Sequence, residues 1–409
     1  MSGDVRRLDE WDAPRLRGLA DEFDTPLYVL DPDRVRKNCD RLLGAFPASD
    51  VHYAVKANTT RTVLETVREA GLGAECASAG EVRRALDAGF PASEVRYTAV
   101  NPPGRDLDAV VEWADEHPEL TVTVDSRDTL ERIADRGYEG RLCVRVNPGV
   151  GAGHHAKVTT GDAPQFGVPY DRAPGLCEAA RDVGDLVGLH AHAGSGIMGE
   201  DLSAHEELVR RMSALAGEVG EDGSLEFVAV GGGFGVPYRP EEPPLDLDSV
   251  AETTREAFDC DARLAVEPGR YVVADAGVLL TRVTATTETP ETTVVGADAG
   301  MTDLIRPALY GAYHHIDCLA PDAADREATT CLVAGPVCET ADILGEGRSL
   351  PEPRRGDLLA VGNAGAYGYE MASQYNSRPR PAVVTVDGGT VARRETLADL
   401  TRLEPNYHT

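Results

Sequence analysis

The stretch from residue 50 to about residue 275 repeats one pattern: a short apolar run, a turn, and then a helical stretch whose apolar residues lie three and four apart. Eight of the apolar runs are predicted strands, at 51–57, 73–77, 95–100, 120–125, 141–147, 186–192, 225–230 and 263–267. Strands that alternate with helices predict a parallel sheet, and eight such units predict a closed (β/α)8 barrel of the TIM type.

The pattern changes after Tyr271, where β-branched segments are separated by Gly, Pro and Asp and show little helical spacing. These segments predict a second, all-β domain, and "TPLYVLD" near the start of the chain predicts one more strand, which we expect to join it. The expected domains are an N-terminal segment at 1–34 that contributes to the β domain, the barrel at 35–275, and a C-terminal β domain at 276–409.

The charge of the chain restricts its partners. Forty basic and 69 acidic residues give a formal net charge of -29, which argues against nucleic acid or an anionic membrane as a partner. The acidic excess fits a protein that a hydrated carboxylate surface keeps in solution in a salty cytosol. Eight scattered cysteines without a C-x-x-C pair, and no apolar stretch of about 18 residues, predict a soluble cytoplasmic protein with reduced thiols.

Lysine is nearly absent, and its few positions are informative. The chain has three lysines, Lys37, Lys56 and Lys157, among its 40 basic residues. Lys56 follows an apolar run that predicts a buried strand, in "VHYAVKANTT". Lysine can lose its proton and form an imine, whereas arginine cannot, so we expect Lys56 to be catalytic. Lys37 is predicted to lie on a helix surface and Lys157 in a loop, without catalytic roles.

The ends of the other predicted strands collect groups of complementary chemistry. The sixth run ends in "HAHAGSG" (190–196), the seventh in "GGGFG" (231–235) and the eighth in "EPGR" (267–270). In such barrels the carboxyl ends of the strands form the active-site face. The glycine run does not match G-x-G-x-x-G, but together with Ser195 and Arg270 it predicts a phosphate pocket.

This face has two candidate chemistries. His190 and His192 form an H-x-H pair that also occurs in metal-dependent hydrolases, but those sites need further ligands on other strands, and none is apparent. We therefore expect no metal. An amine, a phosphate cradle, a flat imidazole and a carboxylate are what pyridoxal 5'-phosphate requires, with Lys56 as its Schiff-base partner and Glu267 at the ring nitrogen.

The motifs "YAVKAN", "HAHAGS", "GGGFG" and "EPGR" resemble those of the fold-type III, alanine-racemase-like pyridoxal-phosphate decarboxylases. Within that group, "MTDLIRPALY", "GPVCETADIL" and "GAYGYEMASQYNSRPRPAVV" resemble the diaminopimelate decarboxylases. Related ornithine and arginine decarboxylases carry Cys-Asp where this chain has Cys338-Glu339. Two short segments depart from the usual pattern, "CETAD" and "GSGIMG".

The resemblance implies roles for individual residues. It implies Lys56 as the Schiff-base lysine and Cys338 as the proton donor. Cofactor contacts are implied for Lys56, His192, Ser195, Gly233, Glu267, Pro268, Gly269, Arg270 and Tyr367, with His192 stacked on the ring and Glu267 at its nitrogen. Substrate contacts are implied for Arg270, Arg306, Tyr310, Glu339 and Tyr367. In the family Cys338 and Glu339 reach the site of the partner subunit, which implies a homodimer whose β domains complete the active sites.

The implied reaction is the decarboxylation of meso-2,6-diaminopimelate to L-lysine and CO2, the last step of lysine biosynthesis. An ornithine, arginine or carboxynorspermidine decarboxylase is the alternative of the same chemistry, and Glu339 with Arg306 and Tyr310 argues against it. A non-catalytic pyridoxal-phosphate binder is the alternative of another class, but the chain keeps Lys56 and Cys338. Metal analysis would identify the third alternative, a metal-dependent barrel hydrolase.

Overall fold

The computed structural model describes residues 5–150, 165–198, 201–220, 223 and 225–405. The chain divides into two compact units, and each is treated by itself. The barrel unit comprises Arg36–Val236 and Leu245–Val272, and the β unit comprises Met1–Val35, Pro237–Pro244 and Val273–Thr409. Lys157, with His154 and His155, lies outside the described residues.

The barrel unit contains the eight parallel strands that the sequence predicts, so the predicted fold is confirmed. The barrel closes because β10 pairs with β2 and β5 pairs with β6. A short ninth strand, β7 (Val168–Pro169), pairs with β6 outside the closed ring. The barrel strands are β2 (Asp50–Ala54), β3 (Gly73–Cys76), β4 (Val95–Tyr97), β5 (Thr121–Val124), β6 (Arg141–Asn147), β8 (Asp185–His190), β9 (Phe227–Ala229) and β10 (Arg263–Val266).

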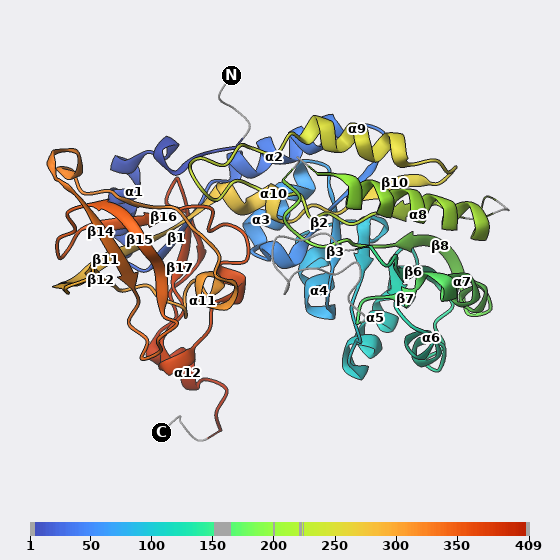
Figure 1. Cartoon of the computed structure of the whole chain (residues 1–409). Coiled ribbons are helices and arrows are strands. Elements are labelled where there is room, and N and C mark those ends of the chain that lie inside the picture. The colour runs from blue at the N-terminus through green and yellow to red at the C-terminus, as the bar shows by residue number, and fades with distance from the viewer. Residues whose placement is uncertain (1–4, 151–164, 199–200, 221–222, 224, 406–409) are drawn as a thin grey trace. The chain divides into compact units, whose positions relative to one another are not determined.

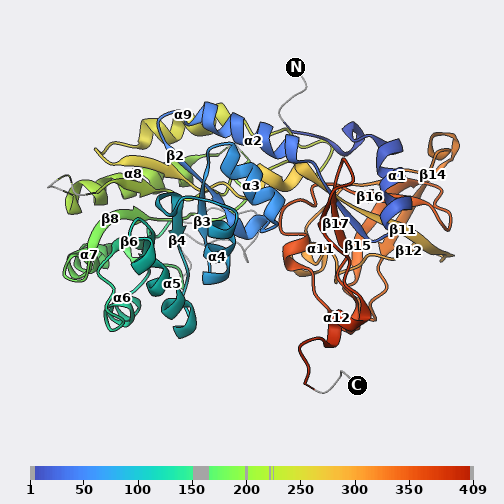
Figure 2. The same ribbon diagram turned by 180° about the vertical axis from the view of Figure 1, so that it is seen from behind.

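Helices cover the outside of these strands, as Figures 1 and 2 show. Their apolar residues face inward, and the side chains of Ser78 and Ser126 cap two of them by accepting backbone N–H groups. The helices are α2 (Pro32–Ala45), α3 (Arg61–Glu69), α4 (Ala79–Asp87), α5 (Gly104–Glu116), α6 (Arg127–Ala134), α7 (Ala173–Arg181), α8 (Ser203–Val219), α9 (Leu247–Ala257) and α10 (Arg270–Val273).

Seven of the eight strands end one to three residues earlier than the sequence predicts, and two of these ends decide where site residues lie. The first predicted strand extends to Ala57, but β2 ends at Ala54 and a 3-10 turn follows at Val55–Ala57. The backbone N–H of Ala54 donates to the carbonyl of Pro268, and that of Asn58 to Val55, so the chain turns out of the sheet. The sixth predicted strand extends to His192, but β8 ends at His190. Lys56 and His192 therefore lie just beyond their strands.

The barrel interior has a small apolar cluster around Phe227, which packs with Cys143, Val187, Ala229 and Ala265. The guanidinium carbon of Arg96 lies 3.6 Å from the centre of the Phe227 ring. Phe227 therefore fills apolar space and also supports a buried charge.

We expect Phe227→Ala to lower the free energy of unfolding by about 3–5 kcal/mol, because the substitution leaves a cavity in a packed core. The measurement is urea-induced unfolding of the purified protein. Phe227→Leu keeps most of the apolar volume and is expected to cost less than about 1.5 kcal/mol. Equal midpoints for the alanine variant and the unmodified protein would contradict the assignment of this core.

A buried histidine on α8 makes the barrel unit sensitive to acid. His205 is 2% exposed, and its Nε2 donates to Thr254 Oγ1 at 2.8 Å, since that hydroxyl itself donates to Val250 O. Burial lowers the pKa of His205 from 6.5 to about 4. The stability that depends on a neutral His205 is complete above pH 6.5 and is lost as the pH falls from 6.5 towards 4.

Between pH 7.5 and pH 4.5 this histidine should therefore remove roughly 2–3 kcal/mol from the free energy of unfolding. His205→Gln keeps an N–H donor but does not titrate, so the variant should lose less stability over this interval. Unfolding midpoints of both proteins at the two pH values measure the difference. An identical acid loss in the two proteins would exclude His205 as its source.

The β unit is built on one nine-stranded mixed sheet. Strand β1 (Leu27–Leu30) lies between β11, with which it is antiparallel, and β17, with which it is parallel, which confirms that the N-terminal strand joins the β domain. The other strands are β11 (Gly277–Glu288), β12 (Thr293–Ala297), β13 (Ile316–Cys318), β14 (Ala328–Ala334), β15 (Ile343–Pro351), β16 (Leu358–Val361), β17 (Ala382–Thr385) and β18 (Thr390–Ala392). The helices are α1 (Ala13–Phe23), α11 (Arg306–Tyr310) and α12 (Leu397–Thr401).

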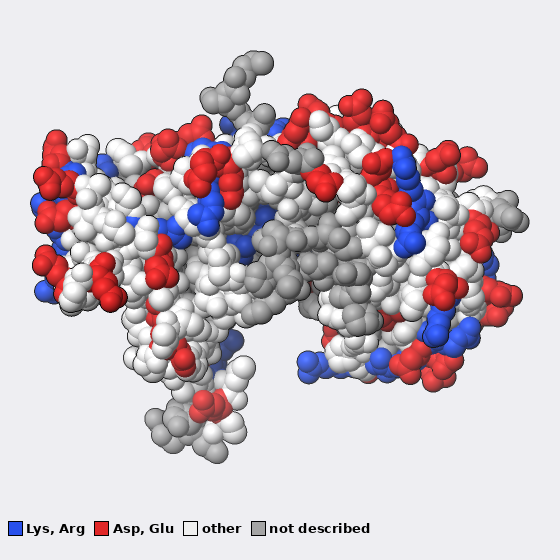
Figure 3. Space-filling model, in the orientation of Figure 1, with Lys and Arg blue, Asp and Glu red and all other residues white. Residues whose placement is uncertain are grey.

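The surface carries many carboxylates, which Figure 3 shows in red across the face that it draws. This distribution agrees with the formal charge of -29. Within the described residues, no helix is long and apolar enough to cross a membrane.

Candidate active site

Lys56 is placed at the carboxyl end of β2 by the 3-10 turn at Val55–Ala57. Its Nζ lies 2.6 Å from Oε2 of Glu75, which belongs to the neighbouring strand β3. The Glu75 side chain is 4% exposed, whereas that of Lys56 is 40% exposed. The carboxylate thus holds the amine at the rim of the barrel.

A second buried pair joins the ends of β8 and β10. His190 Nε2 lies 2.8 Å from Glu267 Oε2, and both side chains are at most 3% exposed. Burial raises the pKa of Glu267, but His190, Arg96 and Lys56 outweigh this effect and lower the pKa below its ordinary value. Glu267 is therefore a charged carboxylate, and its Oε1 has no hydrogen-bond partner among the described residues.

His192 follows β8 and carries a neutral ring. Burial, followed by the positive charges of Lys56 and Arg145, lowers the pKa of His192 to about 3. The backbone N–H of Gly194 donates to His192 Nδ1 at 3.0 Å, so the ring proton resides on Nε2. A neutral, flat imidazole suits stacking against an aromatic ring.

Two glycine-containing loops meet beside this ring. The backbone N–H groups of Gly196 and Ile197 both donate to Gly233 O at 2.9 Å. Gly233 has φ +87°, and a Cβ added there would lie 2.5 Å from Gly194 O. Only glycine fits so close an approach of two backbones.

The predicted phosphate residues gather at the same loops. Arg270, the first residue of α10, is 8% exposed and directs Nη2 to within 3.3 Å of Ser195 Oγ. Pro268 and Gly269 form the buried turn between β10 and α10. A hydroxyl, a guanidinium and a glycine-rich turn together form a site suited to a phosphate group.

The residues of the barrel unit fit pyridoxal 5'-phosphate. The buried Glu267 Oε1 lacks a partner among the described residues and is a ready acceptor for a protonated ring nitrogen. The glycine positions leave room that a Cβ would occupy, and Lys56 supplies an amine. The sequence assigns seven further barrel-unit residues to the cofactor besides Lys56. They lie in the loops after β8, β9 and β10 or begin the helix after β10: His192, Ser195, Gly233, Glu267, Pro268, Gly269 and Arg270.

In the β unit, Arg306 begins helix α11 and is only 3% exposed. Its Nη1 donates to the Tyr238 hydroxyl at 2.8 Å and to His314 Nε2 at 3.0 Å. His314 Nδ1 donates to the carbonyl of Gly362 at 2.8 Å. Nε2 of the same ring therefore accepts the hydrogen bond from the Arg306 guanidinium. Arg306 is thus oriented from two sides.

The other predicted residues of the β unit lie in separate segments. Cys338 and Glu339 are exposed after β14; Asn376 Nδ2 donates to Cys338 Sγ at 3.4 Å, and the Tyr375 hydroxyl donates to Glu339 Oε1 at 2.5 Å. Tyr310 ends α11, and Tyr367 has a left-handed φ of 56° in the loop after β16.

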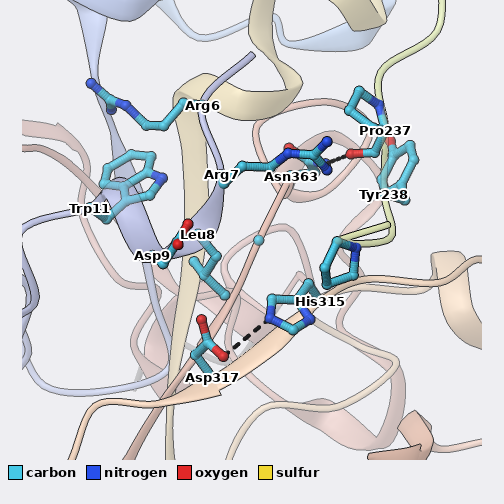
Figure 4. A pocket seen from close by; sticks show the side chains of 12 residues that line it. Arg6, Arg7, Leu8, Asp9, Trp11, Pro237, Tyr238, His315, Asp317 and Asn363 are labelled. Atoms are coloured by element: carbon cyan, nitrogen blue, oxygen red, sulfur yellow. Dashed lines mark hydrogen bonds and ion pairs between the residues drawn. The ribbon is translucent and has the colours of Figure 1, made fainter. Parts of the chain in front are cut away.

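A pocket of about 270 Å³ opens in the β unit next to Tyr238 (Figure 4). Figure 4 shows that Trp11, Leu8, Pro237 and Tyr238 supply apolar walls, whereas the polar groups are engaged with protein atoms. Arg6 binds Asp31, Arg7 donates to the carbonyls of Arg239 and Glu242, Asn363 donates to Pro237 O, and His315 pairs with Asp317. None of the predicted site residues lines this pocket.

Six residues whose side chains contact the predicted ones have no role assigned from the sequence: Glu75, His190, Tyr238, His314, Tyr375 and Asn376. Glu75 was detectable as a carboxylate within an apolar strand, which is rarely placed there without a partner. His190 belongs to the H-x-H pair, a pattern that points to a metal ligand and not to a carboxylate partner. Tyr238 and His314 lie 68 and eight residues from Arg306, and no local pattern connects them with it.

Residues 32–274 match the family described as pyridoxal-dependent decarboxylase, pyridoxal binding domain. The chain is 43% identical over 404 residues to a diaminopimelate decarboxylase from Methanothermobacter thermautotrophicus, covering 94% of this chain and 92% of that protein. It is 34% identical to the diaminopimelate decarboxylase of Escherichia coli, with 96% of each chain covered.

Solved structures give the same result. The crystal structure of diaminopimelate decarboxylase from Helicobacter pylori complexed with L-lysine has a TM-score of 0.88 and 33% identity, and the match covers 95% of this chain and 99% of that one. A structure described as an SrLDC mutant in complex with PLP has a TM-score of 0.81 and 25% identity, and the match covers 94% of this chain and 96% of that one.

Proposed function

The chain belongs to the family of pyridoxal-dependent decarboxylases, and on that premise we propose that it is a diaminopimelate decarboxylase that converts meso-2,6-diaminopimelate to L-lysine and CO2. The observation that carries the proposal is the buried, charged Glu267, whose Oε1 has no hydrogen-bond partner among the described residues. Glu267 is close enough to Lys56 for the lysine charge to lower its pKa. The chain is also similar to diaminopimelate decarboxylases over most of its length.

Pyridoxal 5'-phosphate, when bound, supplies a ring that accepts the electron pair left behind by the departing carboxyl group. Lys56 would hold the aldehyde carbon of the cofactor, and Glu75 would orient the Lys56 amine. Glu267 would keep the ring nitrogen protonated, and the neutral His192 would cover one ring face. Ser195, Gly233, Pro268, Gly269 and Arg270 would hold the phosphate.

Release of CO2 leaves a carbon atom that requires a proton. We assign Cys338 as the donor, because its thiol is exposed on the β unit and accepts a hydrogen bond from Asn376 that orients the sulfur. A thiol is a suitable general acid for a carbanion-like carbon. Lys56 remains the alternative donor.

We assign the distal end of the substrate to Arg270, Arg306, Tyr310, Glu339 and Tyr367. A guanidinium fork binds a carboxylate better than an ammonium group does, and Arg306 is already oriented by Tyr238 and His314. Glu339 would bind the distal ammonium group. A substrate without a distal carboxylate, such as ornithine, would leave the buried charge of Arg306 without a carboxylate to balance it, which disfavours the alternative decarboxylases.

The assembly and location are also part of the proposal. Cys338 and Glu339 are exposed in the single chain, which supports a homodimer in which each β unit completes the site of its partner. Residues 35–275 would then form the domain that binds the cofactor. Residues 276–409 would form the β domain that completes the active site of the partner, and residues 1–34 would contribute a strand to that β domain. Reduced thiols and the acidic surface support a cytoplasmic location.

The proposal is tested by reconstituting the purified protein with pyridoxal phosphate and offering it a panel of substrates. We expect a visible absorption band that borohydride shifts, and CO2 release from meso-diaminopimelate with little from ornithine, arginine or lysine. Size-exclusion chromatography with light scattering should give the mass of a dimer. Protein that does not bind the cofactor would refute the enzyme assignment, and equal turnover of ornithine would refute only the substrate.

A further inference from the structure

The buried contact between His190 and Glu267 has no counterpart among the roles described above. His190 Nε2 meets Oε2 of Glu267, while Oε1 has no partner among the described residues. The two oxygens of the Glu267 carboxylate therefore differ in their hydrogen bonding. One is held by His190, and the other is buried without a hydrogen-bond partner among the described residues.

The position of the ring proton follows from the same contact. The carboxylate is charged and can only accept, so the proton lies on His190 Nε2. His190 Nδ1 is buried and has no hydrogen-bond partner among the described residues, so the single hydrogen bond to Glu267 is the specific restraint that the structure records for both side chains. A buried polar pair of this kind is fixed in one geometry, because breaking it would leave two groups unsatisfied.

We infer that His190 is a positioning residue: it fixes the Glu267 carboxylate so that Oε1 faces the ring nitrogen of the cofactor. This inference rests on the proposed function and adds a residue that does not itself touch cofactor or substrate. A carboxylate free to rotate about its last bond would present either oxygen, or neither, to the nitrogen. The histidine removes that freedom before the cofactor arrives, which is electrostatic preorganisation.

Two substitutions separate the hydrogen bond from the shape of the side chain. His190→Leu fills a similar volume without a donor, and His190→Gln places an amide N–H near the position of Nε2. We expect the leucine variant to bind pyridoxal phosphate about 10- to 100-fold more weakly, which corresponds to the loss of one hydrogen bond to a charged group. The glutamine variant should regain most of the affinity.

Binding is measured by titrating each protein with pyridoxal phosphate and recording visible absorbance, without any substrate. The pH dependence of the absorption band is the second readout, because a displaced carboxylate holds the proton on the ring nitrogen less well. We expect the band of the leucine variant to change at lower pH than that of the unmodified protein.

His52→Leu serves as a matched control. His52 is also a barrel histidine, 2% exposed, and its ring nitrogens have no hydrogen-bond partner among the described residues. The control should bind the cofactor within about twofold of the unmodified protein, since it removes no bond to Glu267. If His190→Leu and His52→Leu behave alike, or if glutamine restores nothing, the inference is wrong. If the unmodified protein binds no cofactor, the proposed function fails first.

Discussion

Lys56→Arg should lower kcat by about 10³-fold or more, because the substitution keeps the positive charge and removes the only group in its position that can bond covalently to an aldehyde. The arginine can still pair with Glu75, so the fold should be preserved. Initial rates of CO2 release from meso-diaminopimelate measure the effect. Far-ultraviolet circular dichroism and the unfolding midpoint measure the fold.

Lys37→Arg is the matched control for this experiment. Lys37 lies exposed on helix α2, away from the strand ends, and the same chemical exchange there should leave the rate unchanged. The borohydride-sensitive absorption should persist in this control and disappear in Lys56→Arg. A Lys56→Arg protein with more than one-tenth of the original kcat would show that another residue forms the covalent link.

Glu267→Gln should reduce kcat by about 10²–10³-fold, the effect of removing one preorganised electrostatic partner from an active site. The amide has almost the same shape as the carboxylate but no negative charge, so the ring nitrogen loses the group that keeps it protonated. The cofactor should still bind through Lys56 and the phosphate contacts. The variant should therefore be coloured but slow, with its absorption band altered.

The same variant tests the charge of Glu267 in the free protein. Because the pKa of Glu267 is lowered, stability from this carboxylate is present above its unfolded value and lost only as the pH falls below that value. Glu267→Gln should accordingly unfold more readily at pH 7 and differ less from the unmodified protein in acid. A variant of unchanged kcat would exclude Glu267 as the partner of the ring nitrogen.

The barrel was predictable because each strand of a parallel barrel is covered on both faces. Such strands are continuous apolar runs, and the eight runs stand out between amphipathic helices. The ends of the strands were less predictable. Lys56 and His192 follow apolar residues directly, and the end of β2 depends in part on the hydrogen bond from Ala54 to Pro268, more than 200 residues away.

That the proposed cofactor-binding groups all follow the ends of barrel strands was predictable for a related reason. In a barrel, residues after different strands converge on one rim, so motifs far apart in sequence can be combined without knowing their geometry. The supporting contacts follow another rule. The contact of His190 with Glu267 depends on side-chain directions. The contact of Tyr238 with Arg306 depends on a segment inserted from the β unit, Pro237–Pro244. The sequence reveals neither.

The position of β1 has a consequence for biosynthesis. Leu27 pairs with Leu280 on one side and Ala382 on the other, so β1 leaves the ribosome well before its partners, which are made some 250 and 350 residues later. At ordinary translation rates that delay is roughly 10–70 s. Throughout it, an apolar strand with two unpaired edges is available for aggregation. The barrel strands can pair before β17 is made, but β1 cannot, so this chain is expected to depend on chaperones that shield β1.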